Sequence, residues 1–77
     1  MTVTITYKDN FLGITKQYTN VDYDKVSYKE TKRRKFNVIS KQVRIENGKR
    51  DIVLDYTTSS SSIKIQDEET GRTVFEA

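Results

Sequence analysis

The sequence predicts a single small all-β domain, residues 1–77, made of about six antiparallel strands in hairpins. Two observations carry this prediction. Apolar residues alternate with polar ones along much of the chain, and turn-forming residues separate the alternating runs at short intervals. The chain also has no proline, which would remove ladder hydrogen bonds from a strand. We expect a small, partly open barrel or a two-sheet sandwich.

Composition limits what such a domain can enclose. With 77 residues, of which 34% are hydrophobic, the core must be small, although five Tyr and three Phe supply area to it. There is no cysteine, so neither a disulfide nor a thiolate metal site can support the core. No apolar run approaches the roughly 18 residues of a membrane span. We therefore expect a cytoplasmic protein without a membrane partner.

The first hairpin follows from alternation. Residues 2–8 alternate strictly between apolar and polar, as a strand with one buried face requires. Turn formers come next, and a second β-rich stretch covers residues 14–18, so residues 2–20 are predicted to form a hairpin. Beyond it the inward-facing positions change from even to odd. This change predicts a bulge or corner near Thr19 and Asn20.

Residues 21–35 allow two interpretations. Apolar positions at a spacing of two, filled by β-branched and aromatic residues, favour a strand through about Tyr28 followed by a basic loop. The alternative is an α+β fold with one short helix at about 21–34, because Asn20 could cap it. Acidic residues would then lie in its first turn and basic residues in its last.

A second hairpin is predicted around residues 47–48, an Asn-Gly pair that suits a type I′ turn with positive φ at both central positions. A two-residue turn there fixes the register of the flanking strands. It pairs Arg44 with Asp51 and Val43 with Ile52.

Two further segments complete the chain. Residues 63–67 and 72–76 read as a third hairpin, in which Asp67 faces Arg72 across a four-residue connection that ends in glycine. The stretch 57–62 (TTSSSS) holds no side chain that could fill a core. We expect it to be a mobile surface loop.

The residues argue against catalysis. Without His or Cys, the chain cannot assemble Ser-His or Cys-His machinery. Asp22 and Asp24 would share a face of an extended strand, but carboxylate chemistry also needs a substrate groove. The acidic run 67–69 lacks the spacing of a calcium loop, and the serines at 59–62 have no base beside them. We predict a non-enzymatic protein with no cofactor and no metal.

Charge is distributed in blocks. Residues 29–50 hold nine cations and two anions, so their charge is 9 − 2 = +7. Residues 51–77 carry 2 − 6 = −4, and the whole chain carries +3. Clustered cations next to an aromatic residue suit phosphate contacts with base stacking, although such a run can also be a solvated, solubilising face. The candidate binding residues are Lys29, Lys32, Arg33, Arg34, Lys35, Lys41, Arg44, Lys49, Arg50 and Tyr28.

Two function classes fit these residues. In the first, a basic loop and hairpin surface contacts a nucleic acid backbone. In the second, the domain is a protein interaction module or small inhibitor that docks on an acidic protein surface, as a monomer or a weak homo-oligomer that associates through edge strands. The first hypothesis requires the cations to gather in one area, away from the carboxylates of the last third.

Overall fold

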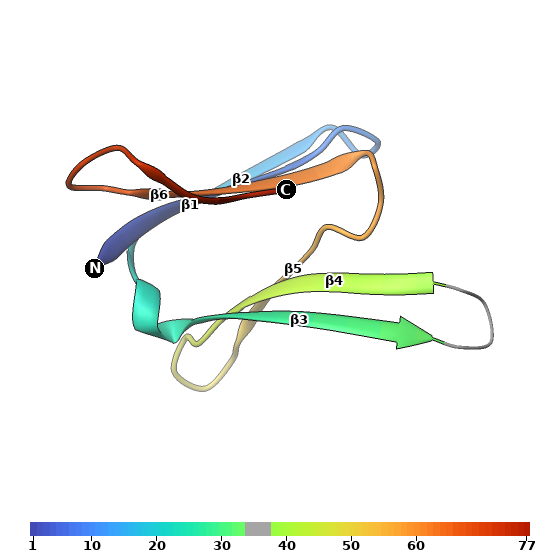
Figure 1. Cartoon of the computed structure of the whole chain (residues 1–77), viewed down its shortest axis with the longest axis horizontal. Coiled ribbons are helices and arrows are strands. Elements are labelled where there is room, and N and C mark those ends of the chain that lie inside the picture. Colours follow the sequence, from blue (N-terminus) through green and yellow to red (C-terminus); the bar gives the residue numbers. More distant parts are fainter. Residues whose placement is uncertain (34–37) are drawn as a thin grey trace.

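The computed structural model describes residues 1–33 and 38–77, and gives the backbone alone for Arg33 and Val38. Two antiparallel sheets lie one over the other (Figure 1). The larger sheet has the strand order β2-β1-β6-β7 and the smaller has the order β3-β4-β5, and they do not close into a barrel. The all-β prediction is confirmed, in its two-sheet form. The elements are β1 (Thr2–Asp9), β2 (Ile14–Asp22), a 3-10 turn η1 (Tyr23–Lys25), β3 (Val26–Arg33), β4 (Val38–Ile45), β5 (Ile52–Asp55), β6 (Ser61–Asp67) and β7 (Thr73–Glu76).

Strand β1 forms the middle of the larger sheet. It pairs with β2 on one side and with β6 on the other, so that Ile5 lies opposite both Tyr18 and Ile65. Val3 and Ile5 are fully buried, as the strict alternation of residues 2–8 predicts. The pairing of β1 with β6 joins the two ends of the described chain.

A bulge interrupts the pairing of β1 with β2. The register shifts between Val3 and Ile5, and Asn20 on the facing strand has a φ of 57°. Asn is one of the few residues that adopt this left-handed conformation readily. The irregularity predicted near Thr19 and Asn20 is thus confirmed.

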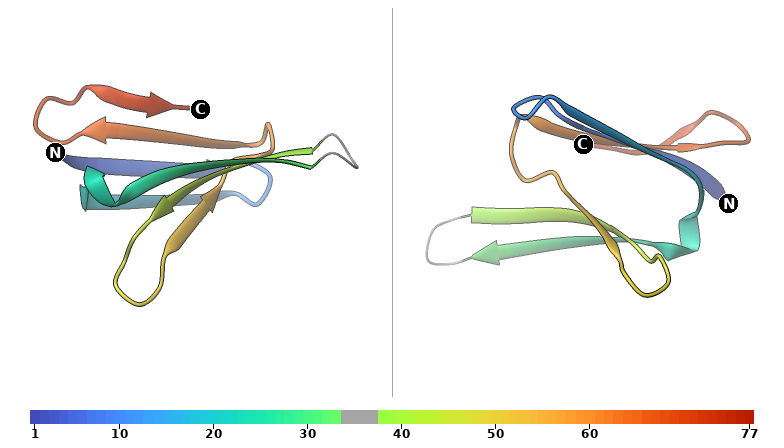
Figure 2. Two further views of the ribbon diagram at one scale, coloured as in Figure 1. Left: turned by 60° about the horizontal axis from the view of Figure 1, so that its bottom comes forward. Right: turned by 180° about the vertical axis from the view of Figure 1, so that it is seen from behind.

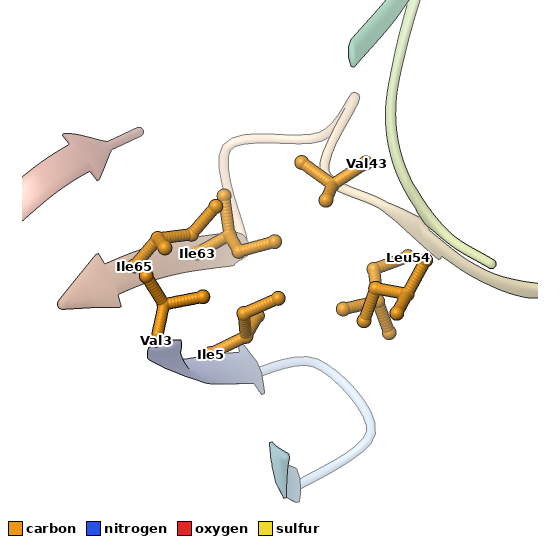
Figure 3. Close-up of a cluster of buried hydrophobic side chains, with 7 residues drawn as sticks. Val3, Ile5, Val43, Leu54, Ile63 and Ile65 are labelled. Carbon is orange, nitrogen blue, oxygen red and sulfur yellow. The ribbon is translucent and has the colours of Figure 1, made fainter. Parts of the chain in front are cut away.

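The core lies between the two sheets and draws on both of them. Figure 3 shows the aliphatic side chains pointing toward one another from the two layers. At one edge, the Phe75 ring of β7 lies 4.7 Å from the Tyr28 ring and 5.9 Å from the Tyr56 ring, measured between centroids. These aromatic contacts bind the layers together beside the aliphatic cluster. The buried core residues are Val3, Ile5, Val43, Ile45, Leu54, Ile63 and Ile65.

Residues 21–33 differ from both interpretations of the sequence. Instead of the short helix considered for about 21–34 there is a single 3-10 turn, where the Asp22 carboxylate accepts a hydrogen bond from the Asp24 backbone N–H (3.0 Å). Strand β3 then continues to Arg33, so the basic loop predicted after Tyr28 is wrong for residues 29–33. Its charged residues stay extended because every position of β3 pairs with β4.

The register predicted for β4 and β5 is wrong by two residues. Ile45 lies opposite Ile52, and Arg44 lies opposite Val53 rather than Asp51. The turn explains the shift. The backbone carbonyl of Asn47 accepts a hydrogen bond from the Arg50 backbone N–H (3.2 Å). Gly48 has a positive φ but Asn47 does not, so the predicted type I′ turn with Asn47 and Gly48 at its centre does not form. A two-residue shift keeps each side chain on its face, which leaves the predicted apolar face correct.

In the last third of the chain, one prediction is wrong and another is confirmed. Ser61 and Ser62 were expected in a surface loop, but they begin β6, because they pair with the end of β1. The third hairpin forms as predicted. The Asp67 backbone N–H donates to the Arg72 carbonyl (2.8 Å), and Gly71 has a φ of 74°.

Candidate functional site

The outer half of the β3–β4 hairpin is a two-stranded ribbon. Strand β5 pairs with β4 only over Gln42–Ile45, whereas β3 follows β4 as far as Val38. Residues 30–33 and 38–41 therefore form ladder pairs only with each other, apart from a hydrogen bond that the Tyr56 backbone N–H donates to the Lys41 carbonyl (3.0 Å). We call this ribbon the arm. The arm extends past the strands of the larger sheet in every view (Figures 1 and 2).

Cations lie on both faces of the arm and its base. Lys32 and Lys41 share the face that carries Val43 and Ile45, because directly opposed residues and every second residue point the same way. Lys29 at the base points to the other face, opposite Gln42. All three lysines are exposed. Glu30 lies directly opposite Lys41, so the lysines are not free of negative charge.

The other predicted cations are divided between two places. Arg44 lies on the outer face of the smaller sheet, where its Nε is buried without a hydrogen-bond partner in the described part of the chain. Lys49 and Arg50 lie in the β4–β5 turn, at the far end of β4 from the arm tip, roughly 23 Å away at about 3.3 Å per residue. Thus the structure does not bring these cations into a single area, which one binding surface on loop and hairpin together required. Only the cations of the arm and its base lie together. The side chain of Arg33 and the whole of Arg34 and Lys35 lie outside the described residues.

The acidic β6–β7 turn lies at the opposite end of the molecule from the arm (Figure 1). Asp67 lies opposite Val3, at the start of β1. The Glu68 carboxylate accepts hydrogen bonds from the Thr4 hydroxyl (2.8 Å) and the Asn20 backbone N–H (2.6 Å). Because of this distance, the turn should weaken the positive field of the arm less than nearer carboxylates do. Asp55, opposite Gln42, lies on the outer face of the smaller sheet near its cations.

Tyr28, the predicted stacking residue, is engaged within the fold. Its hydroxyl hydrogen-bonds that of Tyr23 (3.0 Å), and its ring packs on Phe75. Partial burial raises the pKa of the Tyr28 hydroxyl above its ordinary value, and the hydrogen bond with Tyr23 acts in the same direction. Although the side chain is 44% exposed, one side of it belongs to the contact between the sheets.

Thr57 ties the arm to the β5–β6 connection. Its hydroxyl donates to the Asp55 carboxylate and accepts from the Lys41 backbone N–H (3.0 Å). The hydrogen bond from Thr57 lowers the pKa of the Asp55 carboxyl, against the opposing effect of desolvation. Lys41, the first arm residue on β4, is thus anchored by the Thr57 side chain and also by the Tyr56 backbone N–H, which donates to the Lys41 carbonyl (3.0 Å).

The β1–β2 turn carries exposed apolar side chains that the sequence analysis did not single out. Phe11 is 85% exposed and Leu12 is 64% exposed. We call these two residues, with Ile14, the apolar turn. The signal was present in the sequence, since a Phe-Leu pair between turn formers cannot continue an alternating strand.

A separate groove of about 500 Å³ opens between β2 and the β4–β5 connection. Tyr18, Asn20, Asp22, Lys25, Glu46 and Asn47 are among its lining residues. Asp22 is already occupied in capping η1, and Asp24 lies inside that turn, so the two carboxylates do not share a strand face. Across residues 1–33 and 38–77, no cluster of three or more acidic side chains is arranged to hold a metal ion.

Comparison with known proteins gives no guide to function. No family model matches the chain, and no significant match was found among curated proteins or among solved structures. The described part of the chain contains no helix long and apolar enough to cross a membrane.

Proposed function

We propose that this domain binds a nucleic acid backbone, without catalysis, through the arm. The observation that carries the proposal is the exposure of Lys32 and Lys41 on the arm, which extends beyond the rest of the fold, and of Lys29 at its base. By sequence, residues 29–41 carry six cations and one anion, a charge of 6 − 1 = +5. Lysine and arginine contacts to phosphates release condensed counterions, which supplies most of the affinity of sequence-independent binding.

The separation of charge along the molecule supports the same proposal. The carboxylates of residues 67–69 lie at the opposite end from the arm, where they repel a bound polyanion least. Glu30 and Asp55 weaken the local field, and they reduce the number of phosphates that the arm can neutralise. Lys49 and Arg50 lie beyond the other end of β4 from the arm tip, so we expect them to contribute less than the lysines of the arm and its base.

The test uses two triple variants with the same net charge. K29Q/K32Q/K41Q, the arm variant, removes charges of the arm and its base. K25Q/K49Q/R50Q removes three cations near the opposite end of β3 and β4, and each variant lowers the formal charge from +3 to 0. Binding to a fluorescent oligonucleotide is measured by polarisation as a function of salt. If about five phosphates are neutralised, log K should fall against log salt with a slope near −3.5 to −4.5.

The arm variant should bind roughly 100-fold more weakly at about 0.1 M salt, with a slope smaller in magnitude by about 2, because three contacts are lost. The control variant should stay close to the parent protein. Equal losses in the two variants would show that net charge, and not the arm, drives binding. No retention of the oligonucleotide at low salt would disprove the proposal.

A second candidate function rests on the open sheet edges. Strands β2, β7, β3 and β5 each end a sheet, and so present unpaired backbone groups to which a partner strand can add. An acidic partner protein that adds a strand along β3 would then also contact the lysines of the arm. Capture of a defined acidic protein after nuclease treatment, lost in K29Q/K32Q/K41Q, would favour this function if the oligonucleotide does not bind.

A further inference from the structure

The apolar turn is held in a fixed shape although its side chains are exposed. The Asp9 carboxylate accepts hydrogen bonds from the backbone N–H groups of Phe11 (3.0 Å) and Leu12 (3.1 Å). The Asn10 backbone N–H donates to the Ser60 carbonyl (2.9 Å), so the turn is also attached to the β5–β6 connection. A Phe presented on such a backbone loses little conformational entropy when it binds a partner.

The apolar turn and the arm lie at the same end of the molecule. The β5–β6 connection touches both, through Ser60 at the turn and through Thr57 at Lys41. Both views in Figure 2 show the β1–β2 turn and the arm on the same side of the fold. Lys32 and Lys41 point to the face of the smaller sheet that also faces the larger sheet, which carries the turn.

We propose that Phe11 stacks on an unpaired base of a single-stranded nucleic acid whose phosphates lie along the arm. The inference rests on the proposed function and names its substrate class. Exposed aromatic rings beside a cationic track are how proteins hold single strands without sequence preference, because every base has a π face. In a duplex the faces of the bases are stacked on one another, so Phe11 gains this contact only with a single strand.

The surroundings of the ring favour a base over a lipid surface. Asp9, Asn10 and Thr15 flank the apolar residues, and inserting the turn into a bilayer would desolvate them. Stacking requires only the ring face, which the 85% exposure of Phe11 leaves accessible. The lysines can bind the phosphates of a nucleic acid or of a lipid headgroup. The Phe11 ring therefore distinguishes the two ligands.

The experiment compares F11A, F11L and F11W in the full chain. The probes are a ten-nucleotide oligo(dT), a duplex of similar length, and vesicles of phosphatidylserine and phosphatidylcholine. F11A and F11L should each bind oligo(dT) roughly 5- to 100-fold more weakly, the range expected for loss of one base–aromatic stack, while duplex affinity stays the same. F11W should keep the affinity, and its fluorescence should be quenched by oligo(dT). F11L is the decisive control, because it keeps an apolar side chain and removes the π face.

Full oligo(dT) affinity in F11L or F11A would overturn the stacking role, and the proposed function would survive if K29Q/K32Q/K41Q still loses binding. Vesicle binding could also be abolished in F11A and preserved in F11L, with oligo(dT) affinity unchanged in both. That result would assign the apolar turn to a lipid surface and would also overturn the stacking role of Phe11. If the parent protein binds no oligonucleotide at low salt, both proposals fail together.

Discussion

The larger sheet and the arm are both antiparallel β-structure, but they differ in what surrounds each strand. Strand β1 is paired along both sides and contributes the fully buried Val3 and Ile5. The strands of the arm are paired on one side only, and Ile39 in β4 remains 39% exposed. Pairing between its two strands, together with the contacts of Tyr56 and Thr57 to Lys41, therefore keeps the arm extended, while burial stabilises the larger sheet. The comparison separates residues that hold the fold from residues that are free to bind.

The largest difference in the free energy of unfolding should come from replacing one isoleucine in each region by alanine. Ile65 is fully buried, so I65A should lower the free energy of unfolding by about 2–5 kcal/mol, a large share of the roughly 4–12 kcal/mol of a domain this size. I39A, in the arm, should cost within about 0.5 kcal/mol. Urea unfolding followed by far-UV circular dichroism measures both. Equal costs would mean that the arm is packed as tightly as the core.

Replacing one of two phenylalanines, Phe75 or Phe11, should give a smaller difference in stability. Phe75 is partly buried and contacts the rings of both Tyr28 and Tyr56, so F75A should cost about 2 kcal/mol. F11A should leave the midpoint of urea unfolding unchanged within error, because Phe11 is 85% exposed. A loss of stability in F11A would show that the apolar turn is packed and not presented.

The smallest effect concerns the anchor between the arm and the β5–β6 connection. T57V removes the hydroxyl that donates to Asp55 and accepts from Lys41, at a cost of about 1 kcal/mol at pH 7. The pKa of Asp55 is lowered in the fold, so its contribution to stability is present above its ordinary value of 3.8 and is lost as the pH falls through the folded-state pKa.

The difference between parent and T57V should accordingly shrink in acid. Urea midpoints of the two proteins at pH 7 and near pH 3 measure this change. A difference that is the same at both pH values would contradict the role of the ionised Asp55 carboxylate. A difference that grows in acid would reverse the predicted sign.

The sequence predicted the parts of the fold in which pattern and burial agree. Alternation over residues 2–8 identifies β1, because one face of that strand is buried, and the change of parity identifies the bulge, because Tyr18 and Val21 of β2 both pack against the core. The apolar face of β4 and β5 was also predictable. Their register was not, since a shift of two residues leaves every side chain on its face and only the turn distinguishes the alternatives.

Residues without an apolar pattern were harder to predict. Lys29 and Lys32 lie in a strand because β4 pairs with them, and Ser61 lies in a strand because the end of β1 pairs with it. The residue's own side chain gives no sign of such pairing. For the site, the sequence identified the cations but not their separation along β4, which depends on the three-dimensional direction of the strands. The exposure of Phe11 depends in the same way on the absence of covering side chains.

The pairing of β1 with β6 also has a consequence for how quickly the chain can fold. Val3 lies opposite Asp67, so the centre of the larger sheet unites residues that more than 60 positions separate. Closing so large a loop costs entropy before any contact compensates for it, and mean sequence separation correlates with slow folding. The β3–β4 and β4–β5 hairpins are local and can form early. We therefore expect the pairing of β1 with β6 to limit the folding rate. Since Ile63 and Ile65 belong to the core, a newly synthesised chain cannot complete that core until both residues have been made.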